Sequence, residues 1–189
     1  MPTLHVIVAS TRPGRIGRPV GEWFAAQARE HGAFDVELVD LAEVGLPLFD
    51  EPKHPRLQDY AHEHTRRWSE TVARADAFAF VMPEYNHGYN AALKNAIDFL
   101  WLEWNDKPVA LVGYGGVSGG TRAMQSLKPV LGAVKLRLAA EVPIPFVHER
   151  TDDDGAIEAN EPMRQGAAGA LDALDAEVRL LAAARQSVG

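Results

Sequence analysis

Hydroxyl, guanidinium and glycine residues lie close together in the segment 10–17, near the start of the chain. Two hydroxyls can donate hydrogen bonds, two arginines can bind phosphate oxygens in a bidentate manner, and glycines allow a close backbone approach. A helix that begins directly after such a loop adds free N–H donors and a positive dipole end. The segment therefore predicts a phosphomonoester site, with an ordinary Ser/Thr turn and solvated arginines as the alternative. Its residues are Ser10, Thr11, Arg12, Gly14, Arg15 and Gly17.

Other kinds of phosphate chemistry are excluded because their motifs are missing. The chain has no G-x-x-x-x-G-K-[ST] sequence, which a nucleoside-triphosphatase loop requires, and no G-x-G-x-x-G fingerprint follows the first apolar run. The apolar run 77–82 ends in Met82-Pro83, without the aspartate that a response regulator would phosphorylate. A simple phosphomonoester is the ligand that the segment 10–17 fits.

Two further loops carry groups that suit a flat ring with polar edges. The segment 83–90 has tyrosines that can border a ring and amides that can bind its carbonyls, or it is a surface turn whose Asn and Gly adopt positive φ. The segment 113–120 has five glycines and the hydroxyl of Ser118, so it lies against a ring edge or is a mobile glycine loop. We assign no catalytic acid or base here; Tyr85 and His87 are the two candidates.

Each of the three loops follows a short apolar run of the kind that forms a buried strand. Such runs alternate with segments of helical periodicity, which predicts βαβ units and right-handed crossovers. We expect one α/β domain over residues 1–189, a flavodoxin-like doubly wound parallel sheet with strand order 2-1-3-4-5 and helices on both faces. The expected strands are 4–9, 35–40, 77–82, 109–112 and 136–142, and the expected helices lie near 20–28, 59–74, 91–101, 121–131 and 162–184.

This topology decides between the mononucleotides. Ligands bind beyond the carboxyl ends of the strands, and a planar ring sits where the winding direction reverses, so FMN fits the three loops better than AMP. The segment 41–57 is rich in proline and irregular, and its length indicates a functional or interface loop.

Composition excludes several classes of protein. The 19 basic and 26 acidic residues give a net charge of -7, which disfavours nucleic acid and anionic membrane surfaces as partners. The lack of cysteine excludes disulfides, iron–sulfur clusters and a cysteine nucleophile. Neither a long apolar run nor a secretory leader is readable, so we expect a cytoplasmic protein without a membrane span.

At these same residues the sequence resembles the NAD(P)H-dependent FMN reductase family, whose flavodoxin-like members include quinone and azo reductases. The resemblance extends over about residues 3–142 and rests on the stretches 10–15, 46–50, 83–86, 93–98 and the glycine loop to Gly120. It departs at 15–17, where many relatives have a serine, and at His87-Gly88, where relatives often have a Gly-Ser pair. The resemblance implies that Ser10, Arg12 and Arg15 bind the FMN phosphate, that Pro83, Glu84, Tyr85 and Asn86 contact the ribityl chain and isoalloxazine, and that Gly116, Ser118 and Gly119 close over the ring.

The resemblance also implies an activity and an assembly. We expect hydride transfer from NADPH or NADH through bound FMN to a small-molecule acceptor such as a quinone or free flavin, in a homodimer or a pair of dimers. The alternative is a flavodoxin-type electron carrier that binds FMN without oxidising NAD(P)H directly.

A metal-dependent hydrolase using His54, His62 and His64 is a second alternative. If the segment 59–74 is helical throughout, His62 and His64 point to nearly opposite faces of the helix. We therefore predict that these histidines belong to a solvated polar face and bind no metal.

Overall fold

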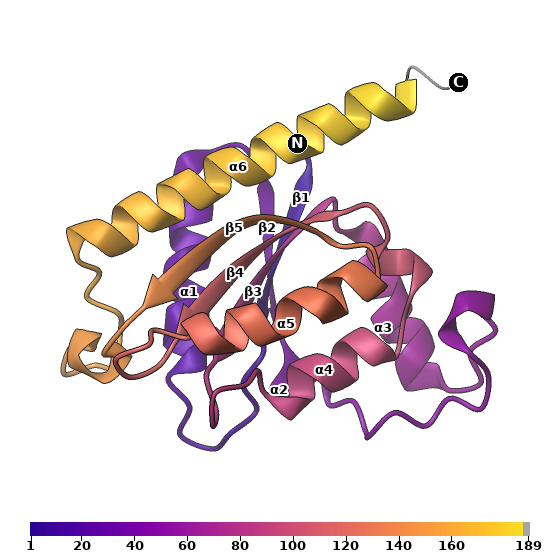
Figure 1. Cartoon of the computed structure of the whole chain (residues 1–189), viewed down its shortest axis with the longest axis horizontal. Helices are drawn as coiled ribbons and strands as arrows, with labels where there is room; N and C mark the ends of the chain where they lie inside the picture. Colours follow the sequence, from indigo (N-terminus) through magenta and orange to yellow (C-terminus); the bar gives the residue numbers. More distant parts are fainter. Residues whose placement is uncertain (187–189) are drawn as a thin grey trace.

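The computed structural model describes residues 1–186, so the last three residues of the predicted domain 1–189 lie outside the described part. Five strands form one parallel sheet in the order β2-β1-β3-β4-β5, which confirms the predicted flavodoxin-like topology (Figure 1). Because the strands are parallel, their carboxyl ends share one edge of the sheet. The strands are β1 (Thr3–Val8), β2 (Asp35–Asp40), β3 (Ala77–Pro83), β4 (Pro108–Tyr114) and β5 (Arg137–Ile144).

Helices connect the strands, as the alternation of patterns predicts. No helix in the described part of the chain has the length and apolarity needed to cross a membrane. The helices are α1 (Gly17–His31), α2 (Leu41–Val44), α3 (Glu63–Arg74), α4 (Ala91–Asp98), α5 (Thr121–Ala133) and α6 (Glu161–Gln186), with 3-10 turns η1 (Pro55–Leu57), η2 (Leu102–Trp104) and η3 (Val147–Arg150).

Alternate residues of each strand face opposite sides of the sheet, and both sides are covered. Leu4 and Val6 of β1 are buried with the apolar residues of α1 and α6, whereas Ile7 is buried with those of α3, α4 and α5. Figure 1 shows these two helical layers with the sheet between them. The two-sided burial explains why the central strands are nearly continuous apolar runs, and it holds the carboxyl ends of β1, β3 and β4 rigidly side by side.

The segment before α3 differs from the prediction. The segment 41–57 is not irregular throughout, since it contains α2 and η1, and the helix expected from residue 59 begins only at Glu63. Buried Glu51 lies beside this start: its carboxylate accepts hydrogen bonds from the backbone N–H of Ala61 at 2.8 Å and of His62 at 3.1 Å. These bonds engage the backbone of the residues that would form the expected first turn.

The expected placement of His62 and His64 on nearly opposite faces of one helix is consequently wrong. His62 is extended (φ -103°, ψ 144°) and precedes the helix, so its ring stacks on that of His64 with centroids 5.1 Å apart, on the same side. Both rings contact Asp50, through its carbonyl oxygen at 3.2 Å from His62 and its carboxylate at 2.9 Å from His64. Within residues 1–186, no three His, Cys, Asp or Glu side chains come together in a way that could hold a metal ion.

Candidate functional site

A cavity of about 330 Å³ lies at the carboxyl ends of β1, β3 and β4, where the three predicted loops meet. That volume is within the range of small-molecule sites. Eight of the predicted site residues line it: Ser10, Arg12, Gly14, Arg15, Pro83, Glu84, Tyr85 and Gly116. The structure places six others outside its lining: Thr11, Gly17, Asn86, His87, Ser118 and Gly119.

The first loop presents donors to this cavity. The side chain of Ser10 is almost fully buried, and its Oγ lies 3.1 Å from the hydroxyl of Tyr85, which joins the first loop to the second. Helix α1 begins at Gly17 without a hydrogen bond from any side chain at its N-cap, Ile16. Its first N–H groups are therefore available to an anion, as a phosphate site at a helix N-terminus requires.

Arg15 is held by a residue that the sequence did not reveal. Its Nη2 donates to Oδ2 of Asp40 at 2.5 Å, and the same oxygen accepts from Nη1 of Arg18 at 3.0 Å. The Nε of Arg15 is buried and has no partner in the described part of the chain. A buried, unpaired guanidinium donor beside a cavity fits an anionic ligand, because such a donor is costly to leave unsatisfied.

Gly17 lies close to Tyr114, and Thr11 lies beside a separate cavity. A Cβ at Gly17 would lie 2.4 Å from the hydroxyl oxygen of Tyr114 and 3.2 Å from the Cβ of Ser10, so the glycine makes room for Tyr114. Thr11 lines a separate cavity of about 220 Å³ together with Leu41 and Leu46.

The second loop is a tight turn. The N–H and C=O groups of Tyr85 and Gly88 exchange hydrogen bonds of 3.0 Å, and Asn86 and His87 between them have φ of 51° and 68°. Two successive positive φ values are typical of a type I′ turn, which leaves Asn86 and His87 exposed at its tip. Histidine at 87 thus occupies a backbone conformation that a glycine adopts without strain.

One part of the third loop packs closely against the protein, and another part is open to the cavity. Gly119 and Gly120 have φ of 58° and 85°, and a Cβ at Gly119 would lie 2.8 Å from the backbone nitrogen of Pro145. Gly119 therefore fits closely against the chain after β5. A Cβ at Gly116 would meet no atom within 4 Å, although Gly116 lines the cavity. The space beside Gly116 is open to a ligand.

Tyr114, Val147 and His148 also line the cavity, and sequence reasoning missed them. Tyr114 ends β4 and is buried, which raises its pKa above that of a free tyrosine. Tyr114 follows the predicted strand 109–112, and this position could have identified it as a residue of the site. The backbone N–H of Val147 donates to the carbonyl oxygen of Gly115 at 3.1 Å, which brings η3 to the cavity. No local sequence pattern predicts that contact.

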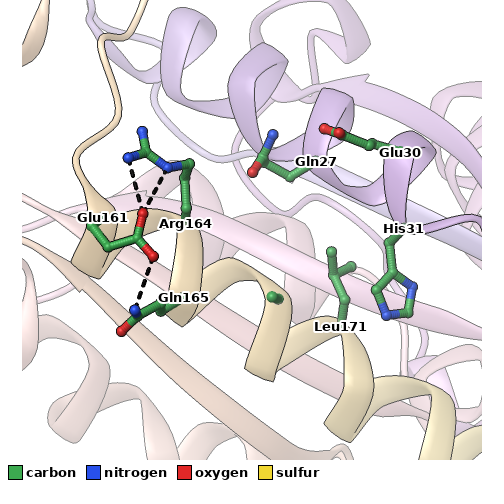
Figure 2. A pocket seen from close by; sticks show the side chains of 8 residues that line it. Gln27, Glu30, His31, Glu161, Arg164, Gln165 and Leu171 are labelled. Carbon is green, nitrogen blue, oxygen red and sulfur yellow. Dashed lines mark hydrogen bonds and ion pairs between the residues drawn. The ribbon is translucent and has the colours of Figure 1, made fainter.

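A second cavity, of about 420 Å³, lies between α1 and α6 toward the C-terminal end of α1. Figure 2 shows Glu161 there, hydrogen-bonded to Arg164 and Gln165 of its own helix. Gln27 and His31 line its other side, and none of the three strand-terminal loops reaches it. We do not assign the nucleotide to this cavity.

Comparison with known proteins agrees with the geometry. A family model described as NADPH-dependent FMN reductase matches residues 2–149. An NAD(P)H-dependent FMN reductase of Schizosaccharomyces pombe is 43% identical over 144 residues, covering 75% of this chain and 72% of the relative. A 2-hydroxy-1,4-benzoquinone reductase of a Burkholderia species is 30% identical over 166 residues, covering 83% and 82%. The solved structure of FerB, a flavoenzyme NAD(P)H:(acceptor) oxidoreductase of Paracoccus denitrificans, has a TM-score of 0.73 and 25% identity, covering 95% of this chain and 98% of FerB.

These matches favour the reductase over the flavodoxin-type carrier as the interpretation of the site. They agree with the groups that line the cavity, because hydroxyls, guanidiniums and glycines suit the phosphate and the flat ring that FMN carries. The chain belongs to the NADPH-dependent FMN reductase family and is an FMN-dependent NAD(P)H oxidoreductase.

Proposed function

We propose that the cavity beyond β1, β3 and β4 is the FMN site, with the phosphate at the first loop and the ring between the second and third loops. The unpaired Nε of Arg15 is the observation that carries this proposal, since it places a buried cationic donor beside the uncapped start of α1. Ser10 and Arg12 line the same end of the cavity and supply further phosphate donors.

The open edge at Gly116 and the Tyr85 side chain border the ring in this proposal. When bound, FMN would supply the redox chemistry that connects NAD(P)H to the acceptor. The chain orients that group: its hydroxyls and guanidiniums fix the phosphate, and its glycines admit a flat ring. The hydroxyl of Tyr85 is engaged by Ser10, which suits a positioning role better than proton transfer. A catalytic role for His87 stays a prediction.

A quinone is the acceptor class that we propose, with free flavin as the alternative. The Burkholderia relative is named for a benzoquinone, and the open space beside Gly116 would admit a flat quinone ring. We propose NADPH or NADH as the hydride donor.

Anaerobic reduction tests the proposal. The purified protein loaded with FMN is mixed with NADPH or NADH, and flavin absorbance near the visible maximum is followed. We expect rapid bleaching, and recovery of the oxidised spectrum when a benzoquinone is added. Flavin that stays oxidised with both nucleotides would contradict the reductase activity, and failure to bind FMN would contradict the site.

We further propose that the chain acts as one flavin-binding domain in a cytoplasmic homodimer or a dimer of dimers. Of the cluster 100–104, Leu100 and Trp104 belong to the core, but Leu102 is 42% exposed, and Leu48 and Leu57 of the segment 41–57 are 84% and 67% exposed. Apolar side chains this exposed favour burial against a second copy. Light scattering of the wild type and of Leu48→Glu tests this, with a monomeric wild type as the contradicting result.

A further inference from the structure

Asp40 is a fully buried carboxylate at the end of β2, beside the first loop. Its side chain has no exposed surface, and both of its oxygens are engaged. Oδ1 accepts from the backbone N–H of Ala42 at 3.0 Å, while Oδ2 accepts from Arg15 and Arg18. A buried charge is tolerated only when it is paired in this way.

The two arginines that Asp40 binds are not equivalent. Arg18 also donates to Glu22 and Glu43, both at 2.6 Å, so carboxylates engage it on several sides. Arg15 has Asp40 as its only ion-pair partner in the described part of the chain, lines the cavity and retains the unpaired Nε. Because a guanidinium is planar, fixing Nη2 also fixes the direction of Nε.

We propose that Asp40 is a positioning residue for the cofactor phosphate: it locks the guanidinium of Arg15 in the orientation that leaves Nε to the phosphate. This inference rests on the proposed FMN site. Arg12 differs, because it is exposed and no carboxylate within residues 1–186 forms an ion pair with it. Arg12 therefore contributes charge to the phosphate without being pre-oriented, whereas Arg15 contributes a donor whose direction is set before the ligand arrives.

Affinities for FMN and riboflavin, measured on the flavin-free full chain by quenching of flavin fluorescence, test the proposal. Riboflavin lacks the phosphate, so the ratio of the two dissociation constants isolates phosphate recognition from ring binding. Asp40→Asn is expected to lower the preference for FMN about tenfold, equivalent to about 1.4 kcal/mol, with riboflavin affinity unchanged. Glu43→Gln is the matched control, because it removes a carboxylate that binds Arg18 alone, and it is expected to keep the wild-type ratio.

A double-mutant cycle decides whether Asp40 acts through Arg15. Arg15→Gln is expected to lower the ratio as much as Asp40→Asn, and the double variant no further, whereas Arg12→Gln combined with Asp40→Asn is expected to be additive. A wild-type ratio in Asp40→Asn, an equal loss for both ligands, or additivity with Arg15→Gln would overturn the positioning role.

Two further results keep the test decisive. If Asp40→Asn does not fold, Asp40→Glu retains the charge but displaces Arg15 by one methylene; a fall in the ratio is again expected, and an unchanged ratio overturns the proposal. A wild-type protein that binds neither flavin overturns the proposed FMN site itself, which distinguishes that failure from a failure of Asp40.

Discussion

The carboxylate of Glu84 binds Arg122 twice, accepting from its backbone N–H and from its guanidinium at 3.1 Å each. Glu84 belongs to the second loop and Arg122 to the first turn of α5, directly after the third loop. Burial alone would raise the pKa of Glu84, but hydrogen bonds from Ser118 and Arg122 outweigh burial and lower it. Glu84, expected from the family resemblance to contact the flavin, thus ties together the two loops that we propose as the border of the ring.

Replacing Glu84 is expected to weaken ring binding. Glu84→Gln loses the charge-assisted bonds, so FMN and riboflavin affinities should both fall by about tenfold while their ratio is preserved, and the free energy of unfolding should drop by about 1–3 kcal/mol. Flavin titration and urea denaturation measure the two effects. Glu141→Gln is the control, since Glu141 also binds residues of α5, Gln125 and Lys128, but from β5. A changed FMN-to-riboflavin ratio in Glu84→Gln would contradict the loop-bridging role.

Filling the space beside Gly116 is expected to exclude the flavin without harming the fold. A leucine at 116 would extend from a Cβ position with no neighbour within 4 Å, into the cavity. We expect FMN binding to fall by at least about a hundredfold, with a melting temperature near that of the flavin-free wild type. Gly169→Leu on α6, also without a neighbour within 4 Å, is the matched control. Normal FMN binding by Gly116→Leu would place the ring elsewhere.

Removing the buried hydroxyl of Ser10 is expected to affect phosphate recognition selectively. Ser10→Ala loses one hydrogen bond to the charged phosphate, worth about 1.5–3 kcal/mol, so FMN affinity should fall by about ten- to a hundredfold and riboflavin affinity should not change. Ser126→Ala on α5 is the control, since that hydroxyl bonds only a local carbonyl, that of Ala123. An equal loss for both flavins would assign Ser10 to the ring side of the cavity.

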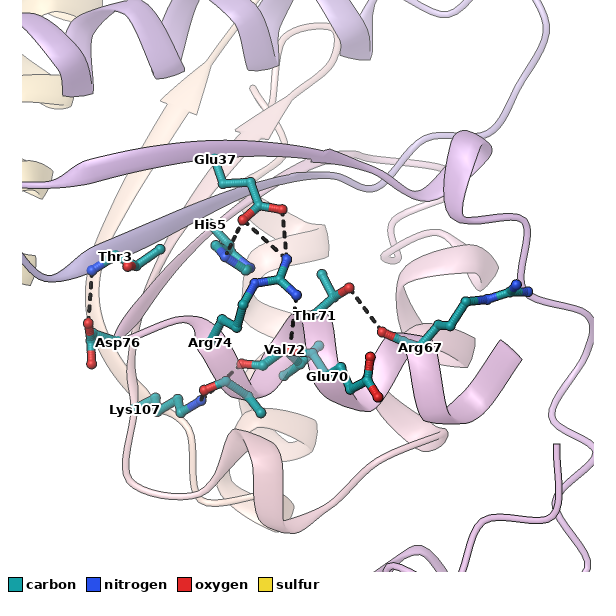
Figure 3. Close-up of polar contacts among 11 residues, drawn as sticks. Thr3, His5, Glu37, Arg67, Glu70, Thr71, Val72, Arg74, Asp76 and Lys107 are labelled. Carbon is teal, nitrogen blue, oxygen red and sulfur yellow. Dashed lines mark hydrogen bonds and ion pairs between the residues drawn. The ribbon is translucent and has the colours of Figure 1, made fainter. Parts of the chain in front are cut away.

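His5 is expected to make the fold sensitive to acid. It is fully buried in β1, near Glu37 and Arg74 (Figure 3), and burial lowers its pKa below 6.5 despite the opposing effect of Glu37. As the pH falls below about 6.5, the unfolded chain takes up a proton that the folded chain does not, so stability is lost, by at most about 1.4 kcal/mol per pH unit. Above that pH, His5 does not contribute to the pH dependence of the folding stability.

Urea denaturation at pH 7.5 and pH 5.0 measures the effect of His5. The fall in stability between these two pH values should be smaller in His5→Phe than in the wild type, whereas exposed His148→Gln should keep the wild-type difference. An identical pH dependence in His5→Phe and the wild type would contradict the prediction.

The sequence by itself determined the sheet and the sheet edge at which the proposed site lies. Continuous apolar runs such as 77–82 can be satisfied only by a strand covered on both faces, and parallel strands bring their following loops to one edge. The helices and their approximate bounds were also predictable, because the periodicity of apolar residues is a local property of the sequence. The start of α3 did not follow, and beside that start the buried Glu51 binds backbone groups ten and eleven residues further on.

Only the tertiary structure decided which polar groups act together. Asp40 ends an edge strand, Arg15 lies in a loop 25 residues earlier, and nothing in the local pattern of either residue specifies that they pair. Tyr114 reaches Gly17 and η3 reaches Gly115 through packing across the sheet edge. Loop composition predicts the kind of ligand, because it fixes which donors exist. The direction of each donor depends on partners distant in sequence, and those are set by the packing of the whole domain.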